Sequence, residues 1–242
     1  MAYSYHDLVI FISDIHEPYS HKDSIPFVSA IRKKYWNRAG NPLAVFLGDE
    51  LTYHGISFHP SDPDVESPGH ELDLGISRIR KWHTLFPKAY VMESNHGSLL
   101  YRKQKFHGIP KFAFKNYNQL LGIPQKDWKW VNDLVIPIGP KKDVYVCHNR
   151  GNDVLKLSQS LGMSAVMGHI HEKMNIQYWG SQLGTNFAMQ CGCLIDNTQA
   201  DFDYNKINLK TPMIGTGVIV NGVPKIYLLI VDRNNRWIGE LI

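Results

Sequence analysis

Residues Leu8 to His16 read Leu-Val-Ile-Phe-Ile-Ser-Asp-Ile-His, and the rest of the chain is interpreted outward from this stretch. The first five residues form an apolar run, rich in Val, Ile and Phe, that is too short for a helix. The run therefore predicts a strand buried on both faces. It stops at Ser13, which places Asp14 and His16 at the carboxyl end of the strand. Ligands bind at that end in open α/β sheets, so this carboxylate and imidazole make half of a metal site.

Four further apolar runs also end in residues that bind metals. They lead into Gly48-Asp49, Glu93-Ser94-Asn95-His96, Cys147-His148 and Gly168-His169-Ile170-His171. A buried strand gains nothing structurally from an Asp, Asn or His at one end. The repetition therefore indicates that these strand ends meet at one site.

The ordered set of motifs resembles the calcineurin-like metallophosphoesterases. That family has Asp-x-His, Gly-Asp, Gly-Asn-His followed by an acid, a lone His, and Gly-His-x-His, in this order. The matching motifs here are Asp14-Ile-His16, Gly48-Asp49, Ser94-Asn95-His96-Gly97, His148 and Gly168-His169-Ile170-His171. Each motif is weak alone, but the full order is a specific signal. The resemblance spans the chain from Leu8 to the C-terminal strands.

The resemblance implies two divalent metal ions. One would be held by Asp14, His16, Asp49 and His171, and the other by Asp49, Asn95, His148 and His169, with Asp49 shared. A bridging carboxylate suits the separation of roughly 3.5–4 Å found in two-metal hydrolytic sites. Imidazole, carboxylate and amide ligands without a thiolate suit transition ions. We expect Mn²⁺, with Fe, Ni²⁺ and Zn²⁺ as alternatives.

His96 is the predicted catalytic residue. It follows the ligand Asn95, is not assigned to a metal, and is placed to protonate the leaving alkoxide. The chain departs from the family at two points: Thr52 and Gly97 stand where relatives often have acids. Because Gly97 cannot orient His96, we expect Glu93, Glu17 or a backbone carbonyl to do so.

Length and composition favour one soluble domain over residues 1–242. The chain has 43% hydrophobic and 20% charged residues, and no Gly/Ser-rich or Pro-rich linker divides it. Its formal charge of +4 permits an anionic substrate without demanding one. The three cysteines are sparse, and Cys191 and Cys193 are interpreted as small buried residues in a reducing cytosol. With no signal peptide and no apolar stretch of membrane-spanning length, a cytoplasmic location is expected.

The order of the expected elements predicts an α/β fold. Helices are expected after Asp23-Ser24 to about Arg38, over 70–86, 97–108 and 111–121, and from about 152 to 161. Strands dominate from residue 134 onward, with an Asn221-Gly222 hairpin turn. The first half alternates strand and helix, and the second half is rich in hairpins. The resemblance implies a four-layer α/β/β/α sandwich of two mixed sheets flanked by helices.

The expected function is metal-dependent hydrolysis of a phosphate mono- or diester, with a nucleotide or nucleic acid as the first candidate substrate. A phosphatase, a phosphodiesterase and a nuclease all remain open. The alternative is a non-catalytic binding or scaffold protein on the same fold. The complete ligand set and His96 favour the enzyme. We interpret two segments, the 51–69 loop and the basic stretch 97–108, as solvated surface. Substrate contact is the functional alternative for both. The oligomeric state is open.

Overall fold

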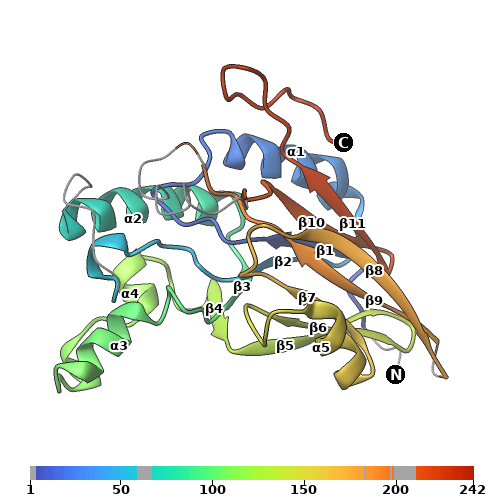
Figure 1. The fold of residues 1–242 in the computed structure, drawn as a ribbon, viewed down its shortest axis with the longest axis horizontal. Helices are drawn as coiled ribbons and strands as arrows, with labels where there is room; N and C mark the ends of the chain where they lie inside the picture. The colour runs from blue at the N-terminus through green and yellow to red at the C-terminus, as the bar shows by residue number, and fades with distance from the viewer. Residues whose placement is uncertain (1–3, 59–66, 183, 197, 199–210) are drawn as a thin grey trace.

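Figure 1 shows the computed structural model, which describes residues 4–58, 67–182, 184–196, 198 and 211–242. The first sheet is built around β1 (Leu8–Ile12) and has the strand order β11-β10-β1-β2-β3-β4. Its other strands are β2 (Pro42–Phe46), β3 (Ala89–Met92), β4 (Trp128–Val131), β10 (Gly215–Val220) and β11 (Val223–Leu228). The strands β1 to β4 run parallel, and β10 runs antiparallel to its neighbours β1 and β11. The carboxyl ends of β1, β2 and β3 therefore lie at one edge.

The second sheet contains five strands in the order β5-β6-β7-β9-β8. These are β5 (Asp133–Gly139), β6 (Lys142–Cys147), β7 (Ser164–Met167), β8 (Met174–Ser181) and β9 (Gly184–Cys191). The strands β6, β7 and β9 are parallel, whereas β5 and β8 pair antiparallel at the edges. Both sheets are thus mixed, as predicted.

Five α-helices and three short 3-10 helices connect the strands of the described chain. The α-helices are α1 (Ser24–Tyr35), α2 (Pro68–Leu85), α3 (Leu99–Phe106), α4 (Tyr117–Leu121) and α5 (Val154–Leu161). The 3-10 helices are η1 (Trp36–Arg38), η2 (His54–Ile56) and η3 (Lys111–Ala113). In Figure 1, α1 and α2 lie on one side of the sheets and α5 lies on the other.

Alternate residues of β1 face two different layers, which explains its continuous apolar sequence. Ile10 belongs to a core shared with Phe27 of α1 and Trp82 of α2. Phe11 belongs to a second core shared with Val146 of β6, between the two sheets. A third core lies under α5, against β7 and β9. The order of layers is therefore helix, sheet, sheet, helix, and the predicted α/β/β/α architecture is confirmed.

The first predicted helix is shorter than expected and starts without a side-chain cap. It ends as an α-helix at Tyr35 and continues as η1. Asp23 occupies the N-cap position but makes no capping hydrogen bond. Its carboxylate instead accepts hydrogen bonds from the Arg236 guanidinium at 2.7 and 2.8 Å and from the Trp237 backbone N–H at 2.9 Å. A tertiary contact has replaced the local cap, and it ties the C-terminal segment to α1.

Asp23→Asn should lower the free energy of unfolding by about 1–3 kcal/mol, because charge-assisted hydrogen bonds to Arg236 are lost. These bonds hold the pKa of Asp23 at about 2, below its value of about 3.9 in unfolded chains. The contribution is therefore full above the unfolded pKa and disappears as the pH falls through about 2. Thermal unfolding should show a gap between wild type and variant that narrows below pH of about 4. The exposed Asp143 supplies a control, and Asp143→Asn should change little.

The predicted helix over 111–121 is two separate pieces. The 3-10 turn η3 ends at Ala113, Phe114 is extended, and α4 begins after Asn116. Asn116 and Gln119 form a reciprocal capping box, which fixes the new start. The stretch with Trp128 and Trp130 forms the strand β4, which pairs with β3.

Smaller predictions in the second half are confirmed. Asn221 and Gly222 both have positive φ between β10 and β11, as a type I′ turn requires. Cys191 and Cys193 are buried free thiols, although Cys193 lies beyond the end of β9. No helix within the described residues is long and apolar enough to cross a membrane.

Candidate metal centre

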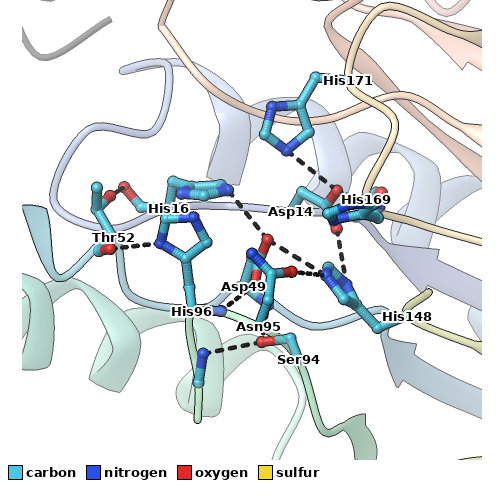
Figure 2. Close-up of polar contacts among 12 residues, drawn as sticks. Asp14, His16, Asp49, Thr52, Ser94, Asn95, His96, His148, His169 and His171 are labelled. Atoms are coloured by element: carbon cyan, nitrogen blue, oxygen red, sulfur yellow. Dashed lines mark hydrogen bonds and ion pairs between the residues drawn. The ribbon is translucent and has the colours of Figure 1, made fainter. Parts of the chain in front are cut away.

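The predicted ligands come together between the two sheets, and each lies just after a strand. Asp14 and His16 follow β1, Asp49 follows β2, and Asn95 follows β3. From the second sheet, His148 follows β6, and His169 and His171 follow β7. Figure 2 shows these seven side chains pointing toward one another. The placement of His148 on the same side as Asp14 is as predicted, with 3.7 Å between its Nδ1 and Asp14 Oδ1.

Backbone conformation marks the same positions. Eight non-glycine residues among the described ones have positive φ, and half of these are candidate ligands: Asp14, His16, Asp49 and His169. Residues other than glycine adopt this region at a cost, and such strain collects at functional sites. The chain bends sharply at the ends of β1, β2 and β7 to aim these side chains at one point.

Two clusters of possible ligand atoms share Asp49. His16, Asp49 and His171 form one, and Asp49, His148 and His169 form the other, with the ligand atoms in each within 4.8 Å of one another. The Nε2 atoms of His16 and His148 each lie 3.4 Å from Asp49 Oδ2. Two ligands about 2.1 Å from one ion lie about 3.0–3.4 Å apart at angles between 90° and tetrahedral. The spacing therefore fits atoms that surround a cation.

The donor atoms also fit a cation in their chemistry. The His148 Nδ1–H donates to the Leu47 carbonyl at 2.8 Å, which leaves a lone pair on Nε2. That Nε2 atom faces Asn95 Oδ1 at 2.7 Å as well as the Asp49 carboxylate. Acceptor atoms that converge in this way repel one another unless a metal cation or a proton on Nε2 lies among them. His171 Nε2 lies 3.3 Å from Asp14 Oδ2, and Asp14 Oδ1 is buried without a hydrogen bond to any described residue.

Burial and neighbouring charges favour the metal-binding forms of His16 and Asp49. Burial lowers the pKa of His16 to about 4, and nearby His96 adds to the shift. The imidazole is therefore neutral at pH near 7, as a ligand must be. Burial alone would raise the pKa of Asp49, but His148, His16 and His96 outweigh burial and hold that pKa well below its usual range. Asp49 is consequently a carboxylate that can bridge two ions.

Access to the centre is from one side. Asp14, His16, Asp49 and His148 are buried, whereas His169 and His171 are half-buried and Asn95 is exposed. His96 is also half-buried. A substrate would therefore meet Asn95, His96 and the two histidines of the Gly-His-x-His motif first.

His96 is oriented by a backbone carbonyl, one of the three predicted possibilities. Its Nδ1–H donates to the Thr52 carbonyl at 2.5 Å, and its own backbone N–H donates to Asp49 Oδ1 at 3.1 Å. Glu17 is instead engaged by the Trp82 indole N–H at 2.8 Å. The Thr52 hydroxyl donates to the His16 carbonyl at 2.8 Å, which fixes this residue in place. Thr52 thus orients His96 through its backbone carbonyl. The proteins that the sequence resembles often have an acid at this position.

Two polar residues support the ligand loops and a buried acid adjoins Asp49, and the sequence analysis assigned none of the three a role. Ser94 Oγ accepts hydrogen bonds from the backbone N–H groups of Asp49 at 2.9 Å and Gly97 at 3.0 Å. Gln190 donates to the carbonyls of Met167 and Gly168, just before His169. Glu50 is fully buried, and no hydrogen bond joins its carboxyl to another described residue. Burial raises the pKa of Glu50 well above its usual range, which favours the neutral form of this acid.

Gly48 has to be a glycine. Its φ is +105°, and a Cβ atom there would lie 2.6 Å from His148 Nδ1 and 2.7 Å from the Ser94 Cβ. The Gly-Asp motif therefore lets the loop after β2 pass between the loops that carry His148 and Asn95.

The remaining histidines lie outside the cluster wherever the structure describes them. His83 on α2 pairs with Asp127 at 3.0 Å. In the predicted 51–69 loop, residues 59–66 with His59 lie outside the described residues, and His54 lies in η2. The interpretation of this loop as solvated surface, with substrate contact as the alternative, stays a prediction.

Comparisons with known proteins add little beyond the fold. No protein-family model matches the chain, and no curated protein matches it by sequence. A solved structure that it resembles is Haemophilus influenzae NAD nucleotidase, with a TM-score of 0.39 and 11% identity. The match covers 90% of this chain and 48% of the nucleotidase, so the chain spans about half that protein's length. At this similarity the likeness carries no functional argument, and the function is inferred from the site.

Proposed function

We propose that the protein is a phosphoester hydrolase that uses two divalent metal ions. The proposal is carried by one observation: two histidine-rich clusters share the carboxylate of Asp49 at the ends of strands from both sheets. Asp14, His16 and His171 complete the ligands of one ion with Asp49. Asn95, His148 and His169 complete those of the other. When bound, such a pair neutralises the phosphoryl oxygens and supplies an ionised water as nucleophile.

The chain's own residues support the remaining chemistry. The Asp49 carboxylate is held by its backbone bond to Ser94 and by the N–H of His96, so its two oxygens stay fixed. The Thr52 carbonyl holds the proton of His96 on Nδ1, which leaves Nε2 as the atom that exchanges protons. His96 would donate a proton from Nε2 to the oxygen that leaves phosphorus.

We infer a phosphate mono- or diester as substrate, with a nucleotide or nucleic acid favoured. The exposed side of the centre carries amide and imidazole groups, which can hydrogen-bond phosphate oxygens. Among possible ions, the mixed imidazole, carboxylate and amide set fits Mn²⁺, Fe, Ni²⁺ or Zn²⁺.

Metal removal is the direct test. Protein stripped with a chelator, with metal loss verified by mass spectrometry, should not hydrolyse p-nitrophenyl phosphate or bis-p-nitrophenyl phosphate, and Mn²⁺ or another transition ion should restore activity. A wider panel of nucleotides and of single- and double-stranded DNA would then rank substrates. Undiminished hydrolysis by the verified metal-free protein would contradict the proposal. Tight binding of two ions without hydrolysis of any ester would favour the non-catalytic alternative.

A further inference from the structure

The positive charge of the chain is concentrated next to the metal centre. Residues 94–126 hold six of the 26 Lys and Arg residues and none of the 22 Asp and Glu residues. The rest of the chain therefore has 20 basic and 22 acidic residues, a net charge of −2. The modest total of +4 thus hides a segment of +6 that begins directly at the active-site loop. A polyanion near the centre would be attracted to this segment.

The same segment exposes aromatic rings to solvent. Every residue from 105 to 116 is exposed. Phe112 is 90% exposed and Phe106 is 76% exposed, and Tyr101 and Phe114 are exposed as well. Folding gains nothing from rings that remain in water, so their presence among lysines points to a binding surface. In Figure 1, α3 and α4 project together at one end of the molecule.

A cavity of about 640 Å³ lies beside these rings, between α3, η3, α4 and β4. Its wall includes Tyr101, Lys111, Phe114, Lys115, Lys129 and Trp130. Lys111 Nζ lies 5.6 Å from the Tyr101 ring centroid, so cationic and aromatic groups alternate at its mouth. Gln125 also lines the cavity. The volume is in the range that encloses a small molecule or a base with its sugar.

The surface is joined to the metal centre by the loop after β3. Ser94 and Gly97 line the cavity, and the ligand Asn95 and the predicted catalytic His96 lie between them in sequence. Arg102 on α3 donates to the Asn95 carbonyl at 2.8 Å, which fixes α3 relative to the ligand loop. A chain of nucleotides with one phosphate at the metal centre could therefore continue along α3 and η3.

We propose that α3, η3 and the adjoining cavity bind a single-stranded polynucleotide that flanks the phosphodiester at the metal centre. The proposal deepens the proposed function and rests on it for the position of the reacting phosphate. Lys105, Lys111 and Lys115 pair with backbone phosphates, and Phe106 and Phe112 stack on bases. Stacking on exposed rings needs unpaired bases, so the surface selects single strands over duplex.

An anionic membrane is the other partner that lysines and aromatic rings could fit, and the cavity argues against it. A membrane surface is contacted by a projecting apolar face. The cavity would not contribute to contact with a membrane, whereas it can receive a base beside the amide of Gln125.

The test uses metal-free protein, so that binding is measured without hydrolysis. A fluorescein-labelled single-stranded 20-mer DNA of mixed sequence is titrated at several NaCl concentrations and followed by anisotropy, alongside the matching duplex. K105E/K111E/K115E should weaken single-strand binding by about tenfold or more and reduce the log–log salt slope by about 2. F106A/F112A should weaken binding by about tenfold or more without changing the salt slope. Both rings are exposed, so the folded state should persist.

K33E/K81E/K156E is the matched control, because it makes the same charge change at exposed lysines of α1, α2 and α5. It should leave single-strand binding within about twofold. Equal binding of DNA by all variants, or a preference for duplex, would contradict the proposed single-strand binding surface. Binding to phosphatidylserine vesicles through the same lysines, without DNA binding, would contradict the proposal in favour of a membrane.

Hydrolysis of bis-p-nitrophenyl phosphate by the metal-loaded K105E/K111E/K115E variant is measured separately. If neither the wild type nor any variant hydrolysed this ester, the result would count against the proposed function. The DNA-binding result would still stand.

Discussion

Asp49→Asn is expected to release both metal ions and to lower hydrolysis by about 10³-fold or more, since two bound cations contribute several kcal/mol of transition-state stabilisation. The amide keeps the size of the side chain but offers one oxygen and one nitrogen that cannot bind a cation. Because Asp49 belongs to both clusters, neither ion keeps a complete set of ligands. Metal content of the purified variant and kcat/KM with added Mn²⁺ are the two measurements.

The neighbouring carboxyl provides the matched control. Glu50→Gln replaces a buried acid that makes no hydrogen bond to another described residue and whose pKa burial raises well above the usual range. This variant should keep both ions and most of its activity. Asn95→Ala removes a ligand of one cluster only and should lose less metal than Asp49→Asn. Equal metal loss in Asp49→Asn and Asn95→Ala would contradict the bridging assignment.

The ligand positions could be predicted from the sequence because the strands are buried on both faces. In such strands every residue is apolar, so a polar residue marks the end of the strand clearly. Parallel strands then bring Asp14, Asp49 and Asn95 to one edge without any knowledge of the loops. His148 was harder to place by physics alone, because it belongs to the second sheet, and only the packing of the two sheets brings it opposite Asp14.

The partners of these ligands could not be predicted, because many of them are backbone atoms. His96 is held by the Thr52 carbonyl and His148 by the Leu47 carbonyl. Because every residue has a backbone carbonyl, the amino-acid sequence does not reveal these partners. Ser94 stood inside a recognised motif, but its bonds to two backbone N–H groups depend on the turn that the loop adopts.

The predicted helix boundaries differ from the structure where local and tertiary interactions compete. Asp23 has the residue type of an N-cap, but Arg236 takes its carboxylate from more than 200 residues away in sequence. The break before α4 was readable in principle, since Asn116 and Gln119 have the spacing of a capping box. The periodic apolar residues on either side concealed this signal.

His96→Ala should keep both metal ions and lower turnover by about 10²-fold or more on an ester with a poor alkoxide leaving group. In this structure His96 belongs to neither metal cluster, and its Nδ1–H is bound to the Thr52 carbonyl. Its Nε2 is therefore the atom available to protonate the leaving oxygen. Turnover of a nucleoside monophosphate and metal content are measured on the same preparation. Loss of a metal ion would make His96 a ligand or structural residue instead.

The leaving group separates proton donation from a general loss of structure. A nitrophenolate hardly needs a proton, so the effect of His96→Ala should shrink strongly on p-nitrophenyl phosphate. His70→Ala, at an exposed position of α2, is the control and should leave both substrates unaffected. Equal losses on both esters would argue against proton donation.

Because a neutral carbonyl stabilises a protonated imidazole less than a carboxylate does, the contribution of His96 should fall toward the lower end of the usual range of about 10²–10⁴. Placing a carboxylate at Gly97 would not restore it, since a Cβ there would lie 3.0 Å from Ser94 Oγ, the group that holds Asp49.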